Sequence, residues 1–98
     1  MQYPIPMVFR IDRLLGGGED ITVLRLSGRM EAEQVDMLRE LLEQEKGKVA
    51  IDCREVTLVS REAIRFLGLS EAQGVELRNC AEYIREWIAR ERRRKERS

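Results

Sequence analysis

The first third of the chain has the apolar and polar pattern of strands. Residues 7–15 and 21–27 are rich in apolar and β-branched side chains, and the glycine-rich residues 16–20 separate them. Two strands joined by a short loop that contains glycine are typical of a hairpin. We therefore expect the fold to begin with a β-hairpin.

The spacing of apolar residues then changes to that of a helix. Val35, Leu38 and Leu42 recur at i, i+3 and i+7, which places them on one face of a helix over residues 31–46. Acidic residues fill the first turns, and Gly47 follows the helix, where a left-handed cap is favoured.

Two further strands and two further helices follow. The consecutive apolar residues within 48–53 predict a buried central strand, and residues 75–80 predict a fourth strand. Helices are expected over residues 61–72 and from Ala81 to about residue 89. The side chains expected to be buried on these helices are Ala63, Ile64, Leu67, Ala81, Ile84, Trp87 and Ile88. The order β-β-α-β-α-β-α predicts an α/β fold, with a mixed four-stranded sheet and three helices.

Composition restricts the class of protein. A chain of 98 residues makes one domain, which we place at residues 1–89, followed by a charged helix end or tail at residues 90–98. The 18 basic and 18 acidic residues cancel, so no global field attracts nucleic acid or anionic lipid. The first seven residues lack the features of a signal peptide, and no apolar run approaches the roughly 18 residues that would indicate a membrane helix.

Cys53 and Cys80 lie in segments of apolar pattern, and no other thiol or histidine stands at metal-ligand spacing. We interpret them as buried free thiols, which suit a reducing compartment. These observations predict a cytoplasmic protein.

The C-terminal segment, residues 90–98, consists mainly of arginine and lysine. One interpretation is a solvated helix end, where cations are favourable. The other is a contact site for an acidic partner or nucleic acid. Few aromatic residues lie near it to stack on bases, so we do not expect nucleic-acid binding.

Three segments resemble the STAS domains, the anti-sigma-factor antagonist family. Residues 21–31 resemble the second strand and the entry to the first helix of that family, residues 48–60 resemble its central strand and the loop beyond, and residues 74–80 resemble its next strand. The resemblance covers about residues 8 to 88. It implies a STAS-like fold and a role in bacterial regulation, in which the domain binds an anti-sigma factor or a related switch kinase.

Two departures from the family pattern qualify that resemblance. Phosphorylation-regulated members carry an Asp-Ser-Ser-Gly-type motif before the second helix, and Arg61 stands here at the phosphoacceptor position. Ser60 occupies the preceding position and is interpreted as the N-cap of the following helix. Family domains also add a further strand and helix, so the sheet here is expected to lack one strand and to leave an edge that must be shielded or used.

Catalytic chemistry has little support in the sequence. The chain has no histidine, which is the commonest general base at neutral pH, and no phosphate-binding glycine motif. Asp52 and Glu55 form a conceivable carboxylate pair, but we interpret them as solvated loop charges. We therefore expect no catalytic residue, metal ion or cofactor.

Recognition of a protein partner is the function that remains. The junction Ser60-Arg61-Glu62 follows a buried strand, where open α/β sheets place their functional loops. Arg61 can form a two-pronged contact with a carboxylate, and Glu62 suits the helix dipole or a contact role. The full set of candidate binding residues is Ser60, Arg61, Glu62 and Arg65, with Arg54 and Glu55 at the rim.

Two alternatives stay open. One is a structural module that forms a homodimer through Trp87, Ile84 and Ile88. The other is a sensor of a small ligand, because related folds can hold apolar or nucleotide ligands. No residue pattern marks a pocket for such a ligand.

Overall fold

The order of elements is the predicted one. A computed structural model describes residues 9–15 and 20–97 of the chain. The strands are β1 (Arg10–Leu15), β2 (Ile21–Met30), β3 (Lys48–Val59) and β4 (Glu76–Arg78), and the helices are α1 (Ala32–Gln44), α2 (Arg61–Ala72) and α3 (Glu82–Arg97). The predicted α/β order β-β-α-β-α-β-α is therefore confirmed. Residues 7–8 of the first predicted strand and most of the predicted glycine-rich loop lie outside the described residues.

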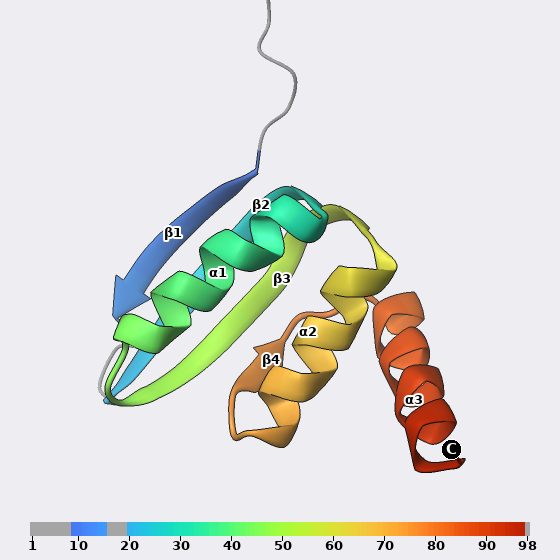
Figure 1. Ribbon diagram of the computed structural model, residues 1–98. Coiled ribbons are helices and arrows are strands. Elements are labelled where there is room, and N and C mark those ends of the chain that lie inside the picture. The colour runs from blue at the N-terminus through green and yellow to red at the C-terminus, as the bar shows by residue number, and fades with distance from the viewer. Residues whose placement is uncertain (1–8, 16–19, 98) are drawn as a thin grey trace, which may run out of the picture.

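The four strands form one mixed sheet in the order β1-β2-β3-β4. β1 pairs with β2 in antiparallel fashion, whereas the β2–β3 and β3–β4 pairs are parallel. Both parallel connections, from β2 to β3 and from β3 to β4, add the new strand on the same side of the preceding one. Because such crossovers are right-handed, they place α1 and α2 on the same face of the sheet (Figure 1).

The hydrophobic core lies between this face and the helices. Side chains that alternate along β2 and β3 form one buried cluster with residues of α1, α2 and α3. The largest fully buried side chains are Leu24, Leu26, Met30, Leu38, Ile51, Ile64, Leu67 and Ile84. Ala63, Ile64, Leu67, Ile84 and Ile88 are buried as predicted, whereas Trp87 is half-buried and Ala81 is exposed. Ala81 precedes the first residue of α3, which explains why it does not join the buried face.

β3 is twice as long as the sequence pattern predicts. It continues beyond Cys53 to Val59, because the equally extended β2 supplies a pairing partner almost to the end. The register slips twice, between Arg25 and Ser27 and between Gly28 and Arg29, and each slip adds one residue on β3. Bulges of this kind accommodate the polar residues of the second half of β3 within a paired strand.

The helix ends show which local signals were informative. Glu31 and Gln34 form a capping box at the start of α1, which ends two residues before the prediction, at Gln44. Gly47 does not adopt the predicted left-handed conformation. At the end of α2, by contrast, Gly74 has a φ of 107°, and the N–H groups of Gly74 and Val75 donate to the carbonyls of Glu71 and Ser70. This Schellman pattern ends α2 where Gln73 and Gly74 predict.

The edge strand β4 is shorter than predicted, because Asn79 adopts a left-handed conformation with φ of 56° and ends it. A three-residue edge that carries Glu76 and Arg78 offers little template for pairing with another chain. α3 then packs beside α2 (Figure 1) and runs on to Arg97. Among the described residues, no helix is long and apolar enough to cross a membrane.

Candidate functional site

Ser60 joins β3 to α2 and is fully engaged in the fold. Its hydroxyl oxygen accepts a hydrogen bond from the N–H of Ala63 at 3.2 Å, and its own N–H donates to the carbonyl of Met30 at 3.0 Å. The predicted N-cap role is therefore confirmed. The bond to Met30 also fixes the start of α2 beside the end of β2.

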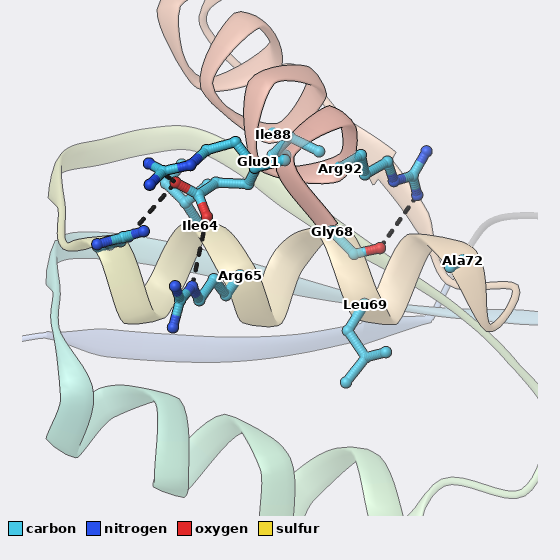
Figure 2. Close-up of a pocket in the computed structure, with 10 residues that line it drawn as sticks. Ile64, Arg65, Gly68, Leu69, Ala72, Ile88, Glu91 and Arg92 are labelled. Carbon is cyan, nitrogen blue, oxygen red and sulfur yellow. Dashed lines mark hydrogen bonds and ion pairs between the residues drawn. The ribbon is translucent and has the colours of Figure 1, made fainter. Parts of the chain in front are cut away.

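Arg61 and Arg65 project from the first turns of α2 and meet one carboxylate on α3. The Nε atom of each arginine lies 3.4 Å from an oxygen of Glu91. Arg94 approaches the same carboxylate at 3.9 Å. Glu91 is only 13% exposed, whereas the Arg65 side chain is 60% exposed. Figure 2 shows the Glu91 side chain extending from α3 toward α2, where its carboxylate meets Arg65.

The surrounding arginines hold Glu91 in its ionised form. Burial alone would raise the pKa of Glu91, but the hydrogen bond from Arg65 and the charges of Arg61, Arg65 and Arg94 lower it below its usual range. A single negative charge is thus shared by three guanidinium groups.

A groove of about 540 Å³ opens between α2 and α3 around this cluster. Its floor is formed by the buried residues Ile64, Gly68 and Ile88, and its rim by the exposed Ala72 and the basic residues Arg61, Arg65, Arg92 and Arg94. Leu69 lies at its edge, 51% exposed, and points away from α3 (Figure 2). We call this feature the α2–α3 groove.

Gly68 determines how closely the two walls of the groove approach. A Cβ atom at this position would lie 3.3 Å from Cγ2 of Ile88, which is tighter than most contacts of real side chains. Arg92 of α3 donates a hydrogen bond of 3.1 Å to the carbonyl of Gly68. The helices are therefore held together across the bottom of the groove by a close contact and a bond from side chain to backbone.

Glu62 is exposed and faces a second, smaller groove of about 330 Å³ between α1 and α2. Arg65 and Leu69 line both grooves, so they form a ridge between the two. Of the predicted site residues, the structure thus brings Ser60, Arg61, Glu62 and Arg65 together at the N-terminal half of α2.

The predicted rim residues Arg54 and Glu55 lie elsewhere. Both lie in the middle of strand β3, and Glu55 accepts a hydrogen bond of 3.0 Å from the Ser27 hydroxyl of β2. Ser27 follows the core residue Leu26, so the pair lies on the sheet face opposite α2. Arg54 is exposed beside the first register slip of β3.

Asp52 is not the solvated loop charge that the sequence suggests. It is a buried strand residue whose Oδ1 accepts hydrogen bonds from the Arg54 N–H at 3.0 Å and from the Asn79 amide at 3.1 Å. Burial alone would raise the pKa of Asp52, but these bonds and the charges of Arg54 and Arg25 lower it. Asp52 therefore has a structural explanation, since it ties β3 to the end of β4.

Cys53 and Cys80 are both free, as predicted, but they are also neighbours. Cys53 is buried and Cys80 is half-buried. A hydrogen bond with Cys80, together with burial, raises the pKa of the Cys53 thiol, and the same bond lowers the pKa of Cys80. Parallel pairing of β3 with β4 brings these positions together, which their spacing in the sequence does not reveal. No group of three or more histidine, cysteine or acidic side chains suited to a metal ion occurs in the described parts of the chain.

Sequence reasoning missed the residues of α3 that complete the groove. Glu91 lies three residues after Ile88 and seven after Ile84, so it continues the buried stripe of α3. That spacing was the available signal that residues 90–97 are more than a solvated helix end. Comparison of the sequence with protein-family models and with curated proteins found no match.

Proposed function

We propose that this chain is a non-catalytic, STAS-like protein-interaction domain in bacterial regulation. Its binding face is the N-terminal half of α2, with Ser60, Arg61, Glu62 and Arg65, and its partner is an anti-sigma factor or a related switch kinase. The sequence resemblance and the observed order of elements support the STAS-like assignment.

The observation that carries the proposal is the loose pairing of Arg61 and Arg65 with Glu91. Arg61 and Arg65 each pair with Glu91 through Nε, at 3.4 Å, and no hydrogen bond occupies their terminal nitrogens among the described residues. A guanidinium group offers five N–H donors in a fixed fork, and charged pairs normally close to about 2.7–2.9 Å. Both side chains therefore retain donors for a partner's carboxylates.

We further propose that binding is constitutive. Arg61 carries no hydroxyl at the position where regulated relatives accept phosphate, and the Ser60 hydroxyl is engaged as the helix cap. A positive charge fixed at this face would attract an acidic partner without a modification step.

The homodimer alternative gains no support from the positions of its three residues. Ile84 and Ile88 are buried within the chain itself, and Trp87 is half-buried against the same core. A dimer formed through them would require α3 to leave α2.

Position-specific photocrosslinking tests the proposed face. A photoreactive phenylalanine derivative replaces Glu62 in one variant and Glu82, an exposed residue in the first turn of α3, in the other. Irradiation in cells of the source organism should yield a discrete adduct with one protein from position 62 and none from position 82. Adducts only from position 82, or from neither position, would argue against this face.

A further inference from the structure

We propose that the α2–α3 groove accepts an acidic, amphipathic helix of the protein partner. This inference rests on the proposed function and deepens it, because it names the chemistry of the segment that binds. It also extends the contact surface from the start of α2 to the exposed edge at Leu69.

Charge is the first argument. The residues that line the groove include four arginines, Arg61, Arg65, Arg92 and Arg94, and one acidic residue, Glu91, a formal charge of +3 on a chain whose net charge is zero. Three of the arginines approach Glu91, and the fourth, Arg92, lies 3.6 Å from Glu71 beside the groove. Such a local excess favours a segment of opposite charge and accelerates its encounter with the surface.

The second argument is that arginines elsewhere in the chain form closer ion pairs than Arg61 and Arg65 do. Arg13 holds both carboxylate oxygens of Glu45, at 2.7 and 3.2 Å. Arg85 contacts Glu71 at 2.8 Å. These side chains are committed to pairs within the fold, whereas Arg61 and Arg65 reach Glu91 more loosely. Glu91 thus positions the two forks and leaves their ends for carboxylates from outside.

The third argument is the apolar part of the groove. Ile64 and Ile88 lie beneath the arginines but are almost fully buried, so Leu69, which is half-exposed, and the exposed Ala72 supply the accessible apolar surface. An amphipathic helix presents apolar residues at i, i+3, i+4 and i+7 with charged residues beside them, which matches exposed apolar side chains next to basic ones. None of the lining residues is aromatic, so the groove lacks the stacking surface that single-stranded nucleic acid uses.

Peptide display tests the inference with a library in place of the partner. Helical peptides with random surface residues are selected against the full chain, and enriched peptides are measured by fluorescence anisotropy. We expect enrichment of peptides with Glu or Asp flanking Leu or Ile at helical spacing, and weaker binding as salt rises. Arg65→Glu and Leu69→Gln should each weaken binding by about tenfold or more.

Two matched variants serve as controls. Arg90→Glu reverses a charge at an exposed position of α3 that does not line the groove, and Met37→Gln removes an apolar side chain that is 50% exposed on α1. Both should bind like the wild type. Circular dichroism on every variant verifies that the fold is retained, and Arg65→Gln replaces Arg65→Glu if the latter unfolds.

Three outcomes would overturn the inference. The first is that no peptide is enriched, and the second is that the enriched peptides are basic or bind equally well to the Arg65 and Leu69 variants. The third is that a labelled RNA or DNA of about 20 nucleotides, which exceeds a typical single-strand binding site, binds in the groove more tightly than the peptides do. If the Glu62 crosslink captures a partner while one of these outcomes is observed, the proposed function stands and only the acidic-helix inference fails. If the crosslink captures nothing while acidic peptides occupy the groove, the groove chemistry is supported and the proposed partner face is not.

Discussion

At the scale of single residues, the polar groups of the fold divide into those with close partners in the same chain and those that are exposed and only loosely paired. Asp52, Ser60 and Glu45 each have their hydrogen-bonding capacity directed inward, to groups of the same chain. Arg61 and Arg65 instead pair loosely with Glu91, at 3.4 Å, and their side chains are 46% and 60% exposed. Because an arginine fork that is only partly used retains the ability to bind a carboxylate, exposure together with loose pairing separates candidate contact residues from structural ones.

Asp52 provides a prediction about pH. Its pKa is lower in the folded state than in the unfolded state, so the ionised carboxylate stabilises the fold. That contribution is fully present above the unfolded-state value of about 3.9 and is lost as the pH falls through the lower folded-state value. Asp52→Asn should therefore reduce the free energy of unfolding by about 1–3 kcal/mol at pH 7, and the difference from the wild type should shrink below about pH 4.

Urea unfolding at a series of pH values measures this effect. Asp36→Asn is the control, because Asp36 is an exposed residue of α1 that pairs only with Arg39 across one helical turn. It should change stability little at any pH. An Asp52→Asn difference that stayed constant down to about pH 2 would show that the carboxylate charge does not stabilise the fold.

At the scale of elements, local signals predicted α2 well and β3 poorly. The ends of α2 follow from Ser60 and Gly74, whose side-chain and backbone chemistry acts within a few residues. The second half of β3 contains charged and polar residues, and it is a strand because β2 pairs with it, which is a long-range effect. The neighbouring positions of Cys53 and Cys80, and of Arg61 and Glu91, depend equally on which elements pack together. Sequence patterning therefore found the α2 half of the candidate site and missed the α3 half.

The packing of α3 on α2 yields a prediction at this scale. Gly68→Leu would place a large side chain against Ile88, where even a Cβ atom is tight. Overpacking of this kind should reduce the free energy of unfolding by about 1–3 kcal/mol. Gly47→Ala is the control, since a Cβ atom there meets nothing within 4 Å and the backbone does not require glycine. Urea unfolding should show Gly47→Ala at or slightly above wild-type stability, and an equal loss for both variants would contradict the packing argument.

At the scale of the whole molecule, balanced charge conceals a local asymmetry. The opposite sheet face carries compensated polar groups, such as Ser27 with Glu55 and Arg25 with Asp52. The helical face instead gathers arginines around one glutamate beside the half-exposed Leu69. A chain of zero net charge can therefore present a cationic, partly apolar face, which composition alone does not reveal.

The most direct test of the central claim is quantitative affinity capture from lysate with the wild type, Arg61→Glu and Arg90→Glu, read by mass spectrometry. Arg61→Glu reverses a charge at the proposed face, and Arg90→Glu reverses one at an exposed position that does not line the groove. We predict that one regulatory protein is enriched equally by the wild type and Arg90→Glu and at least about tenfold less by Arg61→Glu. Equal capture of that protein by all three would contradict the account.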